Sequence, residues 1–200
     1  MSADTADTAA RKRLLRARIR AGRRDLSKGQ QAAANAGLHD QLRELVVSRG
    51  ATSISCYLPV PGEPDTRGFL AWAAEAGIEV LLPISLEGGH LDWVRSTGDA
   101  TIEGSFGILE PVGERLGSLA VAAVDLMIVP AAAVDMRGHR LGWGRGYFDR
   151  TLAALEHRPP VFAVVHDHEV LTEVPTEPHD IPVTGVVTPE QVREFSPQGR

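Results

Sequence analysis

Continuous apolar runs are spaced along the chain with room for helices between them. The runs predict strands at 52–58, 78–86, 91–94, 125–134, 161–165 and 183–187, with 183–187 as the last strand. Runs that are apolar throughout are typical of strands buried on both faces of a sheet. Such strands in alternation with helices predict an α/β fold, in which helices cover both faces of a mainly parallel sheet.

Helical periodicity and capping residues predict the elements between these runs. The segment 11–24 places apolar residues at helical spacing among basic side chains. Ser27, with Gln30 three residues later, forms a capping-box pattern for a helix that Gly50 ends. Shorter helices are expected at 69–76 and at 147–155.

Proline and glycine interrupt the apolar pattern at two places. Pro83 lacks a backbone N–H within the run 78–86, which predicts an edge strand or an early end. Gly88 and Gly89 predict a hairpin that leads into 91–94.

Size and composition indicate one globular domain. The chain has 200 residues, of which 43% are hydrophobic and 24% charged, and we expect a domain over 11–195 between disordered ends at 1–10 and 196–200. No apolar run approaches the roughly 20 residues of a membrane span, and the first ten residues do not form a signal peptide. We therefore expect a cytoplasmic monomer without a membrane partner.

Charge is unevenly distributed along the chain. The net charge of −5 argues against general nucleic-acid binding, yet eight basic residues and no acidic one lie within 11–24. This helix has either a solvated basic face or one or two cations that reach an anionic ligand. RNA or membrane binding is less favoured, because the other basic residues are scattered and no aromatic residue interleaves the run.

The segment 138–150 carries the clearest chemical pattern, because a glycine-rich basic turn follows a predicted strand and leads into a predicted helix. The residues are Gly142, Gly144 and Gly146, the flanking Arg140 and Arg145, and then Asp149. Glycines leave no Cβ atom to keep a ligand off the backbone, and a helix N-terminus offers unpaired N–H groups. The pattern predicts a site for a polyphosphate and its metal ion, although the spacing matches neither the dinucleotide fingerprint nor the Walker loop.

Three loops are expected at the carboxyl edge of the sheet, where ligands gather in such folds. The first contains Glu63 and Asp65, the second contains Arg140, Arg145 and Asp149, and the third leads through His166 and Asp167 toward His179 and Asp180. Each loop therefore brings charged or titratable groups to the same edge.

Other reactive groups are less convincing. His166 and His168 have a spacing that suits a metal, but nothing nearby completes a zinc site. Cys56, the only cysteine, lies in a predicted strand, where we expect a small core side chain. The chain shows no serine elbow either, so we expect charge placement, and no covalent enzyme intermediate, to carry the reaction.

Five motifs occur in an order that identifies a family. The most specific block includes Val129-Pro130, Val134-Asp135 and the run Arg140-Leu141-Gly142-Trp143-Gly144-Arg145-Gly146-Tyr147-Phe148-Asp149. The others are Lys12-Arg13-Leu14-Leu15-Arg16, Tyr57-Leu58 with Glu63 and Asp65-Thr66, Gly107-Ile108-Leu109-Glu110-Pro111, and His179-Asp180-Ile181-Pro182 with Val187-Thr188-Pro189. Over residues 11–190 the chain resembles the 5-formyltetrahydrofolate cyclo-ligases, also called methenyltetrahydrofolate synthetases.

This resemblance implies a three-layer α/β sandwich similar to the sugar-phosphate isomerase and CoA-transferase group. It also implies a ligase that uses ATP and Mg²⁺ to close 5-formyltetrahydrofolate to 5,10-methenyltetrahydrofolate, with release of ADP and phosphate. The expected partners are these small molecules.

The resemblance also assigns roles to residues. ATP would bind to Lys12, Arg16, Arg140, Leu141, Gly142, Trp143, Gly144, Arg145, Gly146, Tyr147 and Phe148, and Mg²⁺ to Asp149 and Asp180. Leu58, Glu63, Trp93 and Tyr147 would line the folate pocket, with Arg145 and Tyr147 nearest the reacting groups. Trp93 has an equally good alternative as a core or edge residue.

The chain departs from the family pattern at Phe148, where a second tyrosine is common, and in the loop 59–62. Trp143 and Arg145 stand where the pattern varies. Three other functions stay open: a sugar-phosphate isomerase that needs no ATP, a non-catalytic folate-binding protein, and an RNA-associated protein whose binding would depend steeply on salt.

Overall fold

The computed structural model describes residues 3–97, 101–103, 109–177 and 180–196. The helices are α1 (Ala3–Arg24), α2 (Lys28–Ser48), α3 (Arg67–Glu75) and α4 (Tyr147–Ala154), with the 3₁₀ turns η2 (Ala120–Ala123) and η3 (Asp167–Glu169). The strands are β1 (Ser53–Ser55), β2 (Glu79–Ser85), β3 (Leu91–Arg95), β4 (Thr101–Glu103), β5 (Leu109–Pro111), β6 (Leu126–Pro130), β7 (Ala133–Asp135), β8 (Arg140–Leu141), β9 (Val161–Val164), β10 (Val170–Leu171), β11 (Gly185–Val187) and β12 (Val192–Glu194).

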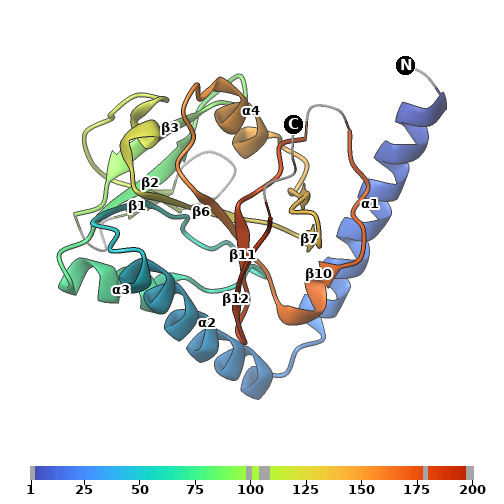
Figure 1. Cartoon of the computed structure of the whole chain (residues 1–200), viewed down its shortest axis with the longest axis horizontal. Coiled ribbons are helices and arrows are strands. Elements are labelled where there is room, and N and C mark those ends of the chain that lie inside the picture. The colour runs from blue at the N-terminus through green and yellow to red at the C-terminus, as the bar shows by residue number, and fades with distance from the viewer. Residues whose placement is uncertain (1–2, 98–100, 104–108, 178–179, 197–200) are drawn as a thin grey trace.

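A seven-stranded sheet in the order β12-β11-β9-β6-β1-β2-β3 forms the centre of the molecule (Figure 1). The five inner strands run parallel, whereas the edge strands β3 and β12 pair antiparallel with their neighbours. The expected α/β fold with a mainly parallel sheet is therefore confirmed.

Helices cover both faces of this sheet. On one face, Leu38 and Leu42 of α2 and Phe69 of α3 pack with Ile54 and Ile128 of the strands. On the other face, the neighbouring strand residues point into a second apolar cluster with α4 and η2. Figure 1 shows α2 and α3 on one side of the sheet and α4 on the opposite side. Successive residues of β6 and β9 contribute to opposite clusters, so these two inner strands are apolar throughout.

Helix α1 lies apart from these layers, beside a small sheet in the order β10-β7-β8 (Figure 1). Its Ile19 packs with Ala132, Ala133, Leu141 and Val174. We expected a disordered segment at 1–10, whereas α1 already begins at Ala3, in an alanine-rich stretch with high helix propensity. Within the part of the chain that the structure describes, no helix is both long and apolar enough to cross a membrane.

The helix predictions agree closely with the structure. Helix α2 begins after Ser27, whose side chain accepts a hydrogen bond from the backbone N–H of Gln30, and the reciprocal half of the capping box is present. The chain leaves this helix through Gly50, at a φ of +59°. Helices α3 and α4 lie within two residues of their predicted bounds.

Two strand predictions are wrong. The run 125–134 forms two strands, because β6 ends at Pro130 and the chain then leaves the central sheet to form β7 in the small one. The strand 183–187 is not the last, since β12 follows it and pairs antiparallel with β11. The predicted hairpin at Gly88 and Gly89 is present between β2 and β3.

The prediction of an early end at Pro83 is wrong, because β2 continues to Ser85, whereas the alternative of an edge is confirmed locally, since only β3 pairs with β2 at this residue. Pro83 faces Trp93 at a non-hydrogen-bonded position of the antiparallel pair, so its nitrogen points toward β1. Strand β1 has already ended there, since its last residue, Ser55, pairs with Leu81. The missing N–H therefore costs no ladder hydrogen bond.

Cys56 lies in the core with 1% of its surface exposed, as expected. Burial raises the pKa of its thiol to about 12. The thiolate, which is the reactive form, is therefore suppressed at neutral pH.

Two glycines provide a matched test of the packing. In Gly185→Ala, the new Cβ would lie 2.4 Å from Phe162 Cε1 and 2.6 Å from the carbonyl oxygen of Arg193. We expect the free energy of unfolding, measured in urea, to fall by about 1–3 kcal/mol through overpacking. Gly22→Ala, within α1 and with no atom inside 4 Å of the new Cβ, should raise it by about 0.5–1 kcal/mol. Equal effects of the two substitutions would contradict the packing at Gly185.

Candidate active site

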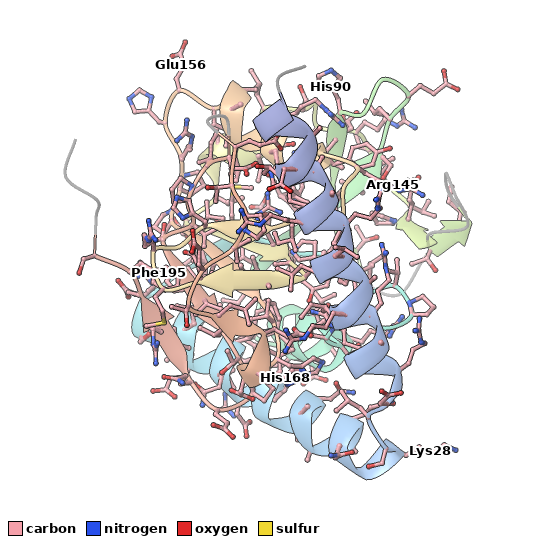
Figure 2. The ribbon with its side chains drawn as sticks, turned by 90° about the vertical axis from the view of Figure 1, so that its right-hand side faces the viewer. Lys28, His90, Arg145, Glu156, His168 and Phe195 are labelled. Carbon is pink, nitrogen blue, oxygen red and sulfur yellow. The ribbon has the colours of Figure 1, made fainter. Side chains whose placement is uncertain are left out.

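A cavity of about 550 Å³ lies where the glycine turn, the loop after β1 and the C-terminal half of α1 meet. Of the predicted residues, Leu58 and Glu63 line it from the loop after β1, and Arg140, Gly142, Trp143, Arg145 and the segment 146–149 line it from the glycine turn. Figure 2 shows α1 across the face of the molecule turned to the viewer, with Arg145 beside it in that view. The structure thus brings the predicted phosphate-binding turn and the predicted folate loop into one cavity.

The glycine turn has a backbone that only glycine adopts readily. Gly144 has a φ of +95°, and Gly146, which caps the N-terminus of α4, has a φ of +70°. Arg150 of α4 supports the turn, because its Nη2 donates to the carbonyl oxygen of Arg145 at 2.6 Å and its Nε donates to that of Gly89 at 2.6 Å. The β2–β3 hairpin and the turn are thereby held together.

Arg140 and Asp149 form an ion pair at the start of α4. The Arg140 side chain is only 3% exposed, whereas that of Asp149 is 30% exposed on the cavity side. Burial lowers the pKa of Arg140, and the charges of Asp149 and Asp180 oppose this shift. Arg140 Nε is buried without a hydrogen-bond partner among the described residues, so a buried donor is unused at this position.

Two cations of α1 reach the predicted site from outside the cavity lining. Arg16 Nε donates to the carbonyl oxygen of Gly142 at 2.7 Å. Lys12 Nζ lies 2.7 Å from Asp180 Oδ2 and 2.7 Å from Glu177 Oε2. Burial, followed by the charge of Arg20, lowers the pKa of Arg16. The face of α1 that carries Lys12 and Arg16 therefore contacts both the glycine turn and the segment around Asp180.

The two predicted metal ligands are each paired with a cation, Asp149 with Arg140 and Asp180 with Lys12. Among the described residues, no group of three or more His, Cys, Asp or Glu side chains forms a metal site. Two carboxylates are too few to bind Mg²⁺ with protein ligands alone. They suit a site in which nucleotide phosphates and water molecules supply the remaining ligands of the ion.

The loop after β1 supplies a partly buried carboxyl group. Glu63 Oε2 accepts a hydrogen bond from the backbone N–H of Val60 at 3.2 Å. Burial raises the pKa of Glu63, while the Val60 N–H, the charge of Arg23 and the Trp143 indole oppose the rise. Leu58 and Tyr57 add apolar surface beside it.

Some predicted residues do not line the cavity. Trp93 has none of its surface exposed, and its Nε1 donates to the carbonyl oxygen of Ser118 at 3.2 Å, so it is a core residue and is not placed to stack on a ligand. Leu141 is buried in the cluster beneath α1. Gly144 lies outside the lining but next to the guanidinium of Arg16. His179 and the motif residues 107–108 lie outside the described residues.

The sequence analysis missed an ion pair that holds the site together. Arg23 donates from Nε and Nη2 to the two oxygens of Glu169, both at 2.7 Å, and the two side chains are 2% and 0% exposed. The same guanidinium donates to the carbonyl oxygens of Ala131 and Gly62, at 3.0 and 3.2 Å. The only signal for this pair was the basic segment 11–24, which did not single out Arg23.

Comparison with known proteins decides the family. The chain matches the profile of the 5-formyltetrahydrofolate cyclo-ligase family over residues 8–189. The chain belongs to this family. The family inferred from the five motifs over residues 11–190 is thus confirmed.

Among cyclo-ligase relatives, the 5-formyltetrahydrofolate cyclo-ligase of Mycolicibacterium smegmatis is 34% identical over 182 residues, covering 88% of this chain and 93% of the relative. That of Escherichia coli K12 is 31% identical over 149 residues, covering 72% and 82%. The NMR structure of Aquifex aeolicus 5,10-methenyltetrahydrofolate synthetase has a TM-score of 0.79 at 30% identity and covers 94% of both chains. The Mycoplasma pneumoniae synthetase, at 18% identity and a TM-score of 0.72, shares the fold.

Proposed function

We propose that this cyclo-ligase family member converts 5-formyltetrahydrofolate to 5,10-methenyltetrahydrofolate, with ATP consumed to ADP and phosphate. The observation that carries the proposal is the single cavity of about 550 Å³ in which the glycine turn faces the loop of Leu58 and Glu63. One reactant must be phosphorylated by the other, so both have to lie next to each other in one site. The names of the relatives support the same activity.

The proposed chemistry begins at the formyl oxygen, which is a poor leaving group at neutral pH. Transfer of the γ-phosphoryl group of ATP to this oxygen gives an imidate-like phosphate. N10 of the folate then attacks the activated carbon and gives up its proton, and the departing phosphate carries away the former formyl oxygen and accepts that proton. Such a reaction depends on positioning and on neutralised charge, and needs no nucleophilic residue of the protein.

In this proposal, the residues of the chain supply both the positioning of the reactants and the positive charge. The glycine turn and the N-terminus of α4 present backbone N–H groups to the phosphates, and Arg16 fixes the turn through Gly142. Arg145 adds positive charge at the transferred group, and Tyr147, which also lines the cavity, lies nearest the reacting end of the folate. Leu58 and Glu63 bind the folate ring.

Asp149 and Asp180 would hold Mg²⁺, which neutralises phosphate charge when bound with the nucleotide. Each carboxylate also pairs with a cation of the protein, so the negative charge of the two aspartates is balanced before the nucleotide binds.

We further propose that the protein acts in the cytoplasm as a monomer. The parallel sheet with helices on both faces supports a place in the sugar-phosphate isomerase and CoA-transferase group.

The decisive experiment follows the absorbance of the methenyl product with purified protein, 5-formyltetrahydrofolate, Mg²⁺ and ATP. We expect signal only with ATP, and one phosphate released for each product molecule. Folate binding without product would instead indicate a non-catalytic binding protein, and turnover of a sugar phosphate without ATP would indicate an isomerase.

Arg145→Ala tests the charge at the transferred group. We expect kcat to fall by roughly 10²–10³-fold, since removal of one electrostatic stabiliser has effects of this size, while the ATP dissociation constant changes less than tenfold. Arg95→Ala serves as the control, because Arg95 pairs with Glu79 at the surface and does not line the cavity. A loss confined to ATP affinity would make Arg145 a binding group only.

A further inference from the structure

Lys12 of α1 holds two carboxylates that lie far from it in the sequence. Its Nζ lies 2.7 Å from Asp180 Oδ2 and 2.7 Å from Glu177 Oε2. The side chain of Lys12 is 10% exposed, that of Asp180 12% and that of Glu177 23%. Because the cluster is largely shielded from water, salt screens its attraction much less than it screens a surface ion pair.

The hydrogen bonds at Asp180 leave no place for a metal ion on the oxygen that Lys12 contacts. Oδ2 accepts from Lys12 Nζ at 2.7 Å and from the backbone N–H of Glu177 at 2.8 Å. A carboxylate oxygen has two lone pairs, and these two donors use both. A divalent cation therefore reaches this oxygen only if Lys12 leaves it.

The cluster lies beside the glycine turn, where the proposed function places the nucleotide. Arg16, one helical turn after Lys12, donates to the carbonyl oxygen of Gly142 at 2.7 Å. Burial lowers the pKa of Arg16, and three carboxylates oppose this shift through their charges, those of Asp149, Asp180 and Glu177. Glu177 thus belongs to the same electrostatic site as the two aspartates, although the sequence motifs did not single it out.

A metal ion alone and a nucleotide differ in what they offer to Lys12. A divalent cation that takes Asp180 and Glu177 without a nucleotide leaves a largely buried ammonium without its partners, which is costly. The phosphates of a nucleotide are alternative partners, because lysine binds phosphate as a compact point charge. When metal and nucleotide arrive together, the exchange of partners leaves no charge unpaired.

We propose that Lys12 competes with the divalent cation for Asp180 and Glu177, and that the phosphates of the nucleotide end this competition by binding the ammonium. Metal and nucleotide then bind with positive coupling, and free Mg²⁺ does not fill the site in advance. Glu177 is a further residue of the site, because it shares Lys12 with Asp180. The inference rests on the proposed function, which assigns Asp180 to the metal and Lys12 to the nucleotide.

The test measures the binding of Mn²⁺ without any nucleotide, by electron paramagnetic resonance of the free ion. Mn²⁺ prefers the same oxygen ligands as Mg²⁺. Methionine in Lys12→Met carries no charge, so both carboxylates are released from the ammonium. We expect the dissociation constant for Mn²⁺ to fall about tenfold relative to wild type, which lies within the usual range for coupled sites. If Lys12 were only a structural or a phosphate-binding residue, its removal would leave Mn²⁺ binding unchanged or weaker.

Lys28→Met is the matched control, since Lys12 and Lys28 are the two lysines of the chain and Lys28 is exposed at the start of α2. Its dissociation constant for Mn²⁺ should equal that of wild type. Unchanged or weaker Mn²⁺ binding in Lys12→Met would overturn the inference, while product formation by wild-type protein with Mg²⁺ and ATP would leave the proposed function intact. Wild-type protein that forms no product would overturn the proposed function, on which the inference rests.

A measurement on wild-type protein keeps the inference testable if Lys12→Met does not fold. In protein labelled with ¹⁵N-lysine, the ammonium groups of Lys12 and Lys28 are the two lysine side-chain groups that NMR observes, and Lys28→Met assigns them. We expect Mg²⁺ alone to leave the Lys12 signal in place, and Mg²⁺ with a non-hydrolysable ATP analogue to shift it. A signal that shifts as far with Mg²⁺ alone, or that shifts with neither addition, would refute the exchange of partners.

Discussion

Asp149→Asn is expected to lower kcat by at least roughly 10³-fold while the chain stays folded. Asparagine has nearly the same shape but removes the negative charge that pairs with Arg140 and that would hold Mg²⁺ on the nucleotide. Loss of such charge stabilisation at a phosphoryl-transfer site has effects of this size or larger. Because the Asp149 side chain is 30% exposed, water can solvate Arg140 in part, and the structural cost should be limited.

The measurement is steady-state kinetics over a Mg²⁺ titration, with thermal unfolding to confirm the fold. Asp40→Asn is the control, since Asp40 is exposed on α2 and does not line the cavity. If kcat of Asp149→Asn equals that of wild type at limiting Mg²⁺, Asp149 does not hold the metal.

Arg23→Met is expected to lower the free energy of unfolding by about 3–5 kcal/mol, the usual cost of leaving one partner of a buried ion pair uncompensated. Methionine keeps only the apolar stem of the arginine side chain and leaves the Glu169 carboxylate buried at 0% exposure without its cation. The carbonyl oxygens of Ala131 and Gly62 also lose a donor. Urea unfolding provides the free energies.

The double variant Arg23→Met, Glu169→Gln separates lost charge from lost packing. Glutamine keeps an oxygen for the backbone N–H of His166, which donates to Glu169 at 2.8 Å, but carries no charge. The double variant should therefore recover part of the stability lost in Arg23→Met. Arg95→Met, in an exposed pair with Glu79, should cost less than about 1 kcal/mol. A similar small cost for Arg23→Met would show that the buried pair is not a structural anchor.

Local patterns predicted the parts of the fold that depend on neighbouring residues. The capping box at Ser27, the hairpin at Gly88 and Gly89, and the helix that follows Gly146 all have short-range signals, and all are present. The split of 125–134 into β6 and β7 has no such signal, because both strands are buried and apolar on each side of Ala131. Strand β12 is short and polar, and it forms only because the edge of β11 is available.

The same distinction applies to the site. The turn 142–146 could be predicted from the sequence, because the positive φ angles at positions 144 and 146 favour glycine and the glycines mark the turn. The pairing of Lys12 with Asp180 spans 168 residues, and that of Arg23 with Glu169 spans 146. Basic residues were abundant in 11–24, and the choice among them depends on the docking of α1, which sequence periodicity does not specify. Trp93 lies in the core, which is one of the two roles that the sequence left open, because an aromatic residue has the same local pattern in a core and in a pocket.

The burial of Cys56 makes this protein a convenient host for spectroscopic probes. With 1% of its surface exposed and a pKa of about 12, the native thiol should stay silent toward maleimide reagents while the chain is folded. A cysteine introduced at Leu14, which is 68% exposed on α1, would then take a fluorophore or spin label without removal of the native one. Such a label would report whether α1 moves against the glycine turn during a catalytic cycle.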